Sequence, residues 1–222
     1  MNWVLMDWIT PALLLLSGYL LGSIPSGWLA GRWLAGLDIR EHGSGSTGAT
    51  NVLRVVGKGP ALAVFLVDVL KGSAAVLLAR VVLGGSAPAS AGSGWMLDAW
   101  VVAAGLAALA GHIWPLWLGW KGGKAVATGL GMLLGLAWPV GLACFGIFLT
   151  VLSLSRIVSL SSVVAALSLP LLMLGWFGSD GLRPAYLALA LLTTTLVVWR
   201  HRANLERLLQ GTEPKLGEKR EG

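Results

Sequence analysis

The sequence predicts an all-α integral membrane protein with about seven transmembrane helices, an N-terminus outside the membrane and a cytoplasmic C-terminus. Composition is the first reason, because 56% of the 222 residues are hydrophobic, only 12% are charged, and the mean hydropathy is +0.78. Several apolar runs also reach the ~20 residues that a helix needs to cross the hydrocarbon core. The distribution of Lys and Arg among the loops is the third reason, and it sets the orientation.

The apolar runs place most of these helices. The first run is much longer than a signal-peptide core and is not followed by an evident Ala-x-Ala cleavage pattern, so we expect it to be retained as a span. The runs predict helices near residues 8–30, 60–83, 97–117, 157–177 and 185–200.

The apolar region at residues 126–155 is too long for one comfortable span, and Trp138-Pro139 interrupts it. Because proline removes a backbone N–H and clashes with the preceding turn, we expect two short helices, 124–138 and 139–155, joined by a tight hairpin. Together the helices predict one transmembrane domain over residues 1–210. A short, charged and disordered tail is expected over residues 211–222.

Basic residues lie in alternate loops of the predicted bundle. Residues 84–96 carry no charge, and residues 178–184 carry only Asp180 and Arg183. Because positively charged loops stay in the cytoplasm, these two loops are predicted to lie outside. The basic loops and the tail contain Arg32, Arg40, Arg54, Lys58, Lys121, Lys124, Arg156, Arg200, Arg202, Arg207, Lys215, Lys219 and Arg220.

The charge and cysteine content exclude several functions. The net charge of +6 follows from the topology and from attraction to anionic lipid. No aromatic pattern is interleaved with the basic residues, so no nucleic-acid partner is predicted. The single cysteine, Cys144, permits neither an intrachain disulfide nor a thiolate metal cluster. Carboxylates do not cluster on the cytoplasmic face, and we predict no metal and no cofactor.

The most informative segment runs from Gly43 to Asn51 and is followed by Arg54. Glycine lets successive N–H groups converge on an anion, and Ser and Thr add hydroxyl donors. Arginine can hold phosphate oxygens through two parallel hydrogen bonds. A flexible Gly-Ser linker is the alternative, but Thr, Asn and Arg at fixed offsets are atypical of a linker. The segment therefore predicts phosphate binding at a membrane surface.

A second cluster, Gly122-Gly123-Lys124, comes just before an apolar helix on the same predicted face. A glycine pair at a helix start presents N–H groups and the positive end of the helix dipole to an anion. The spacing does not match a Walker motif, so nucleotide hydrolysis is not indicated. A membrane-surface anchor is the structural alternative for Lys124.

Two more clusters lie near the cytoplasmic ends of later helices. Ser161 and Ser162 can either cap a helix or contact a ligand. His201 and Asn204 are three residues apart on one helical face, where His can exchange a proton and Asn can hold a hydroxyl. Complementing the helix dipole is the structural alternative for His201.

Buried charge marks a set of secondary candidates. Asp68 and Lys71 are three residues apart inside the second apolar run, so they can pair on one helix face. Ionisable groups at that depth are functional candidates, although a structural pair that ties this helix to the bundle explains them equally well. Ser23 and His112 complete the set, and each can instead be a packing residue.

With these residues in view, the chain resembles the bacterial membrane acyl-phosphate:glycerol-3-phosphate acyltransferase family over most of its length. Two positions depart from the family's usual motifs. Ser46 replaces an asparagine and loses its amide, and Ala125 replaces the last glycine of Gly-Gly-Lys-Gly. The matching segments are 22–27, 43–51 with Arg54, 68–72, 111–128, 155–162, 201–204 and 211–215.

The resemblance implies transfer of an acyl group from acyl phosphate to the 1-hydroxyl of sn-glycerol 3-phosphate, the first step of phospholipid synthesis. The products are lysophosphatidate and inorganic phosphate. It implies a bacterial plasma (inner) membrane protein whose active site faces the cytoplasm, with acyl phosphate, glycerol 3-phosphate, membrane lipid and an acyl-phosphate-producing enzyme as partners. Positioning and charge stabilisation suffice, because phosphate is a good leaving group whose oxygens can accept the proton.

Residue roles follow as hypotheses. Arg54 and Lys124 are expected to neutralise phosphate charge, while His201 and Asn204 orient the glycerol hydroxyl and the carbonyl. These residues form the predicted catalytic set, within one inner-leaflet pocket. The predicted phosphate-binding residues are Ser44, Gly45, Ser46, Gly48, Thr50, Asn51, Gly122, Gly123, Ser161 and Ser162.

Two other functions were weighed. Soluble-domain glycerolipid acyltransferases pair His with Asp five residues later, but here His42, His112 and His201 are followed at that offset by Thr47, Trp117 and Glu206. A transporter or channel for a phosphorylated anion also uses helix breaks and glycine-lined helix starts. It would need polar groups on both faces, and the nearly uncharged outer loops disfavour it.

Overall fold

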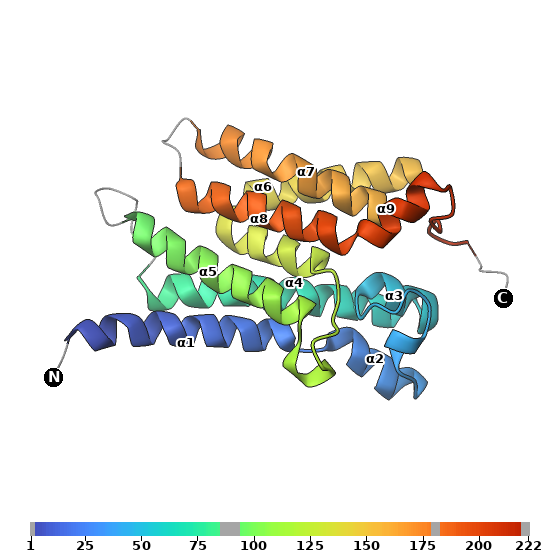
Figure 1. The fold of residues 1–222 in the computed structure, drawn as a ribbon, viewed down its shortest axis with the longest axis horizontal. Coiled ribbons are helices and arrows are strands. Elements are labelled where there is room, and N and C mark those ends of the chain that lie inside the picture. Colours follow the sequence, from blue (N-terminus) through green and yellow to red (C-terminus); the bar gives the residue numbers. More distant parts are fainter. Residues whose placement is uncertain (1–2, 85–93, 179–182, 219–222) are drawn as a thin grey trace. The chain divides into compact units, whose positions relative to one another are not determined.

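The computed structural model describes residues 3–84, 94–178 and 183–218, and every regular element in these ranges is helical (Figure 1). The chain divides into two compact units, Met1–Trp138 and Pro139–Gly222, and each is described by itself. The loops predicted to lie outside, 84–96 and 178–184, fall largely outside the described residues, as do Lys219 and Arg220.

The first unit contains three long helices, α1, α4 and α5, which pack against one another, and short helices α2 and α3 that contact α4 (Figure 1). Small residues allow this packing. A Cβ atom on Gly22 of α1 would overlap the Ala108 carbonyl oxygen of α5, so glycine is needed there. The elements are α1 (Trp3–Ser23), α2 (Ser26–Ala35), η1 (Ile39–Glu41), α3 (Ala49–Val55), α4 (Lys58–Val82), α5 (Gly94–Ile113), η2 (Leu116–Leu118) and the first part of α6 (Val126–Ser155).

The predicted span at 8–30 corresponds to the apolar stretch Trp8–Ala35, but a break divides it. α1 ends at Ser23, and α2 begins at Ser26. Pro25 lies between the two helices with φ −89° and ψ 60°, which is not helical. Proline has no N–H to continue the hydrogen-bond ladder, and its ring clashes with the preceding turn. The sequence prediction did not include this break because the apolar run at 8–30 is little longer than one span.

The predicted interruption before Pro139 is confirmed. Ala137 has φ −148° and ψ 79°, so α6 consists of two helical segments joined at a non-helical residue. The first segment belongs to the first unit and the second segment to the second unit. The tight hairpin between them stays a prediction.

Arg80 of α4 compensates for the missing donor at this break. In a regular helix the N–H of residue 139 would donate to the Gly135 carbonyl, but proline has none. Arg80 Nη1 instead lies 2.7 Å from the Gly135 oxygen, and Nη2 lies 2.9 Å from the Leu136 oxygen. The guanidinium also complements the negative end of the helix dipole.

The second unit contains the rest of α6, then α7 (Val158–Phe177), α8 (Pro184–Arg200) and α9 (Arg202–Leu209). α7 contacts both α8 and α9. The tail is not disordered over its described part, in contrast to the sequence prediction. The Leu216 N–H donates to the Arg156 carbonyl (2.6 Å), and Arg156 Nη2 donates to the Leu216 carbonyl (2.9 Å). These bonds hold the tail against the turn between α6 and α7.

The helix lengths agree with an integral membrane protein. Exposed positions on the long helices carry large apolar side chains such as Leu70, Val81, Leu154 and Leu171, as expected for surfaces that contact lipid. α8 is apolar but shorter than the others. Within the described residues, five stretches are long and apolar enough to cross a membrane: Trp8–Ala35, Lys58–Val82, Gly94–Leu118, Val126–Ser155 and Val158–Phe177.

Candidate functional site

The loop between η1 and α3 is organised by the side chain of Asn51. Its Nδ2 group donates to the carbonyls of Ile39 (3.0 Å), His42 (3.0 Å) and Ser46 (2.9 Å), and Oδ1 accepts from the Ser44 N–H (2.8 Å). Asn51 is 1% exposed. In this structure the Asn51 amide hydrogen-bonds the loop itself, and its predicted direct contact with phosphate stays a prediction.

The other predicted residues of this loop lie at its surface. The Gly48 N–H donates to Ser46 Oγ (3.3 Å), which fixes a turn before α3. Gly45 has φ 69°, a left-handed conformation that favours glycine. Ser44, Gly45 and Arg54 are exposed, and Ser46, Gly48 and Thr50 are half-buried.

Asp38 and Arg40 join this loop to the loop that follows α5. Asp38 accepts hydrogen bonds from Arg40 Nη2 (2.6 Å) and from Trp28 Nε1 (3.2 Å). Hydrogen bonding to Arg40 holds the pKa of Asp38 well below its usual range, although desolvation opposes this. Arg40 Nη1 donates to the Leu118 carbonyl (3.0 Å). The first two predicted clusters thus lie on neighbouring loops of the first unit.

The Gly122–Gly123 pair packs tightly against the end of α5. The Gly122 N–H donates to the Ile113 carbonyl (3.1 Å), and the Gly123 N–H donates to the His112 carbonyl (3.1 Å). Protein carbonyls accept from both amides in this structure, and their predicted role as phosphate donors stays a prediction. Glycine is needed for a different reason, since a Cβ on Gly122 would overlap the His112 carbonyl and one on Gly123 would overlap the His112 ring.

Lys124 and Ala125 follow this pair. Lys124 is half-buried. Ala125 is buried and has φ 59°, in the left-handed region. Residues with a Cβ pay a steric cost of about 1–2 kcal/mol in this region, and glycine does not. The backbone therefore explains why glycine suits the position where this chain has Ala125.

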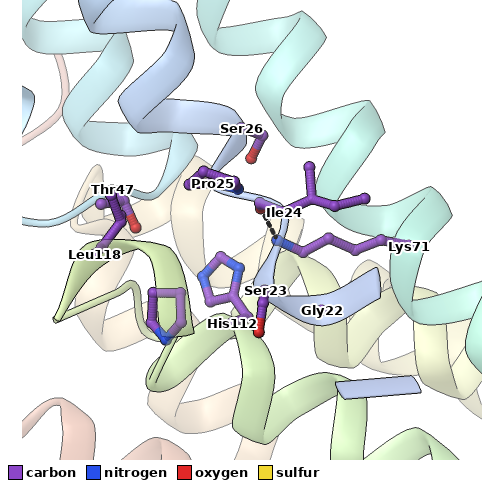
Figure 2. A pocket seen from close by; sticks show the side chains of 10 residues that line it. Gly22, Ser23, Ile24, Pro25, Ser26, Thr47, Lys71, His112 and Leu118 are labelled. Atoms are coloured by element: carbon purple, nitrogen blue, oxygen red, sulfur yellow. Dashed lines mark hydrogen bonds between the residues drawn. The ribbon is translucent and has the colours of Figure 1, made fainter. Parts of the chain in front are cut away.

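The predicted pair on α4 is present and buried. Lys71 Nζ lies 2.8 Å from Asp68 Oδ1, and the two side chains are 3% and 1% exposed. Ser26 Oγ donates to the same carboxylate oxygen (2.7 Å), and His112 Nδ1 lies 3.6 Å from it. Lys71 Nζ also donates to the Ile24 carbonyl (3.0 Å), as Figure 2 shows.

A cavity of about 10 Å³ lies beside this pair (Figure 2). The secondary candidates Ser23, Lys71 and His112 line it, together with Ser26 and Thr47. The Ser23 hydroxyl is fully buried and has no hydrogen-bond partner in the described part of the chain. The volume suits about one water molecule and is too small for a phosphate group.

In the second unit, Ser161 and Ser162 are buried near the start of α7. Their hydroxyls donate to the carbonyls of Ile157 (2.8 Å) and Val158 (2.8 Å), four residues earlier. A phosphate accepts hydrogen bonds and needs donors. In this structure both hydroxyls donate within the helix, and the predicted phosphate contacts of these two serines stay a prediction.

His201 follows α8 and is 3% exposed. Its Nδ1 lies 2.8 Å from the Val197 carbonyl oxygen. Because a carbonyl only accepts, Nδ1 carries the proton, and the neutral ring has its lone pair on Nε2. The predicted part of His201 in orienting the substrate hydroxyl stays a prediction.

Glu213 connects the residues around Asn204, and the sequence analysis did not single it out. Its Oε1 accepts from Asn204 Nδ2 (2.6 Å) and Ser159 Oγ (2.7 Å), and Oε2 accepts from Arg207 Nε (2.7 Å). Burial raises the pKa of Glu213, but the hydrogen bonds from Asn204, Ser159 and Arg207 outweigh it and hold the pKa below its usual value. Glu213 thus orients Asn204 and ties the tail to α7 and α9.

The structure brings the predicted clusters together in pairs. The first and second clusters lie on neighbouring loops of the first unit, and the start of α7 and the region of Asn204 meet through Glu213 in the second unit. The four-cluster pocket stays a prediction. Among described residues, no group of three His, Cys, Asp or Glu side chains could hold a metal ion.

Comparisons with known proteins identify the family of the chain. A family model described as glycerol-3-phosphate acyltransferase matches residues 12–211. The glycerol-3-phosphate acyltransferase of Prochlorococcus marinus (strain MIT 9313) is 71% identical over 204 residues, which cover 92% of this chain and 94% of that protein. The corresponding protein of Synechococcus sp. (strain CC9902) is 65% identical over 212 residues, covering 95% of this chain and 98% of that protein.

Two crystal structures of PlsY (YgiH), an integral membrane glycerol 3-phosphate acyltransferase, are also similar. The glycerol 3-phosphate form is 36% identical with a TM-score of 0.81 and covers 94% of this chain and 96% of that chain. The lysophosphatidic acid form is 35% identical with a TM-score of 0.78 and covers 93% and 95%. The chain belongs to the glycerol-3-phosphate acyltransferase family.

Proposed function

We propose that this protein transfers an acyl group from acyl phosphate to the 1-hydroxyl of sn-glycerol 3-phosphate. The products are lysophosphatidate and inorganic phosphate. Family membership supports the reaction class, and the glycerol 3-phosphate and lysophosphatidic acid forms of the similar crystal structures support the acceptor and the product. Acyl phosphate as donor rests on the sequence motifs.

One observation of this structure carries the proposal: two loops that bear cations and hydroxyls are joined within the first unit. The hydrogen bond from Arg40 to the Leu118 carbonyl connects the loop that leads to Arg54 with the loop that leads to Lys124. Both substrates carry phosphate groups. Cations on neighbouring loops suit such a reaction, because they lower the cost of bringing two anions together.

The proposed step is a direct acyl transfer. The 1-hydroxyl oxygen attacks the carbonyl carbon of acyl phosphate, the bond from that carbon to the phosphate oxygen breaks, and the electron pair leaves with phosphate. The hydroxyl proton passes to a phosphate oxygen. Arg54 and Lys124 stabilise the charge that grows on the leaving group. His201, through Nε2, and Asn204, oriented by Glu213, align the hydroxyl with the carbonyl.

The proposed setting is the bacterial plasma membrane, with the N-terminus outside and the active site on the cytoplasmic face. The break at Ala137 supports counting α6 as two helices. α8 is apolar but shorter, and we count it as a further helix. With the other candidate spans, this gives the predicted set of about seven. Cysteine substitutions at Lys58 and Lys215, labelled from either side of the membrane, should both react only from the cytoplasmic side.

A donor comparison tests the proposed reaction. Purified protein in liposomes should form lysophosphatidate from labelled glycerol 3-phosphate when acyl phosphate is supplied. Acyl-CoA or acyl-carrier protein in the same liposomes should give little product. Equal rates with acyl-CoA would refute the donor assignment.

The same liposomes separate acyl transfer from transport. Phosphate release that depends on glycerol 3-phosphate supports acyl transfer, whereas accumulation of label inside the liposomes without a new lipid supports a transporter. Activity that a chelator abolishes and Mg²⁺ restores would contradict the prediction that no metal is needed.

A further inference from the structure

The buried pair on α4 is bonded to irregular segments of the chain. Asp68 accepts from Ser26, and Lys71 donates to the Ile24 carbonyl, so both contact the break between α1 and α2. Asp68 also faces His112 at the end of α5, where the chain leaves the helix. The pair therefore lies where its charges can fix non-helical backbone in place.

His112 connects this pair to the segment before α6. On one side, its Nδ1 lies 3.6 Å from Asp68 Oδ1. On the other side, the His112 carbonyl accepts from the Gly123 N–H (3.1 Å). The Nε2 edge of the His112 ring fills the space that a Cβ atom on residue 123 would need. His112 thus contacts residue 123 through both its main chain and its ring.

Apolar packing alone does not fix this ring. A cavity of about 10 Å³ adjoins the ring, so side chains do not enclose it on every side (Figure 2). The carboxylate of Asp68, 1% exposed and held by Ser26 and Lys71, is the group positioned to restrain Nδ1. A buried ion pair is a costly way to gain stability, because apolar side chains of similar size often do as well. The cost of burying Asp68 and Lys71 is better explained if the pair fixes the position of another segment of the chain.

We propose that Asp68 and His112 are positioning residues that hold the segment Gly122–Lys124 in place. Asp68 sets the His112 ring, the ring sets Gly123, and Gly123 sets the main chain that carries Lys124. The functional importance of this contact rests on the phosphate contact proposed for Lys124. The positioning itself can be measured without any substrate.

Two substitutions of His112 separate the two sides of its ring. Asparagine places its amide nitrogen near the position of Nδ1 and can reach Asp68 but not Gly123. Glutamine places its amide nitrogen near the position of Nε2 and can reach Gly123. His112→Gln keeps the contact with Gly123 but loses the one with Asp68, so it should restore most, but not all, of what His112→Asn loses.

Gly123→Ala tests the same contact from the other side, because the added methyl group displaces the ring and leaves every charge unchanged. Asp68→Asn removes the charge but keeps a side-chain oxygen for Ser26. Ser73→Ala is the matched control. Ser73 of α4 donates to the Gly131 carbonyl of α6 (2.8 Å), so its loss removes a buried contact between two helices without touching residues 122–124.

Hydrogen–deuterium exchange of the intact protein in micelles is the first measurement. The amides of Gly122 and Gly123 donate within the protein, so their exchange reports directly on the segment. The peptide over residues 119–126 should exchange about tenfold faster in His112→Asn and Gly123→Ala, which lose the contact between the ring and residue 123. It should exchange about threefold faster in Asp68→Asn and His112→Gln, which lose the contact with the Asp68 carboxylate, and near the wild-type rate in Ser73→Ala. Unchanged exchange in both His112→Asn and Gly123→Ala would overturn the proposal, as would equally fast exchange in Ser73→Ala.

The acyl transfer rate is the second measurement. kcat/KM for glycerol 3-phosphate should fall about tenfold or more in His112→Asn and stay within about threefold of wild type in His112→Gln. Faster exchange without a loss of rate would support the positioning and refute the phosphate contact proposed for Lys124. A loss of rate in both His112 variants, with exchange unchanged in His112→Asn, would refute the positioning and leave the proposed reaction standing.

Discussion

Arg80 makes the break in α6 possible, and its removal gives the sharpest test of the fold. The guanidinium donates to the carbonyls of Gly135 (2.7 Å) and Leu136 (2.9 Å). Arg80→Leu removes both donors and keeps an apolar side chain for the helix surface. Because lipid supplies no hydrogen-bond donors, nothing in the surrounding membrane can replace the two bonds that these carbonyls lose.

The size of the effect follows from these two bonds. A hydrogen bond to a charged group contributes about 1.5–3 kcal/mol, so two of them give a loss of about 3–6 kcal/mol in the free energy of unfolding. Arg80→Lys keeps a cation but loses the two-pronged geometry, and about half of that loss is expected. Lys58→Leu, an exposed position at the start of the same helix, should change the free energy of unfolding by less than about 0.5 kcal/mol.

Pro139 provides an internal check on this reasoning. Pro139→Ala restores an N–H that can donate to the Gly135 carbonyl. Arg80→Leu should therefore cost about 1–1.5 kcal/mol less in the Pro139→Ala background than in the wild type. Reversible unfolding by sodium dodecyl sulfate in mixed micelles, followed by circular dichroism, measures the wild type, the single variants and the Arg80→Leu, Pro139→Ala double variant. If the two substitutions are additive, Arg80 does not replace the missing N–H and the reasoning is wrong.

Four further predictions concern the candidate site. Arg54→Ala should lower kcat/KM about 100-fold or more with unchanged helix content, and near-normal rates in the acyl transfer assay would remove Arg54 from the mechanism. Asn51→Ala should speed hydrogen exchange over residues 43–48 and lower the free energy of unfolding by about 2–3 kcal/mol, because it leaves four main-chain groups without this partner. Glu213 has a lower pKa in the folded than in the unfolded protein, so its stabilisation is complete above the unfolded value near 4.5 and is lost as the pH falls towards the folded value. Glu213→Gln should flatten that acid-side loss in an unfolding titration, and an unchanged pH dependence would contradict the assignment. Ala125→Val should lower the melting temperature and Ala125→Gly should not, because a β-branched residue fits the left-handed conformation worst and glycine fits it without strain.

The sequence predicted features that follow from local spacing. The pairing of Asp68 with Lys71 follows from three-residue spacing on a helix, and the structure confirms it. The interruption before Pro139 was predictable because the apolar run around it is too long for one span. Pro25 has the same chemistry, but the first apolar run does not exceed one span by much, so length gave no reason to divide it.

The hydrogen-bond partner that each donor meets was harder to predict from the sequence than the donor itself. Asn51 and Gly122 occur in phosphate-binding loops because they supply donors, but the same groups also hold such loops in shape. Which acceptor they meet depends on main-chain carbonyls such as those of His42 and Ile113, and no local pattern shows where these lie. Glu213 was missed because a charged C-terminal segment resembles a disordered tail. Its one signal was the resemblance of residues 211–215 to the family.

Two basic residues of α4, Lys71 and Arg80, follow a common rule that the sequence predictions did not use. Lys71 of α4 donates to the Ile24 carbonyl beside Pro25, and Arg80 of the same helix donates to the Gly135 carbonyl that Pro139 leaves without an N–H. In each case a cation on an unbroken helix satisfies a carbonyl at a break in its neighbour, because lipid cannot. A basic residue inside an apolar run therefore predicts a broken helix nearby. A proline in a neighbouring apolar run predicts the position of the break. Applied to this sequence, the rule would have divided the first span at Pro25, and it gives Lys71 a structural reason that is independent of any reaction.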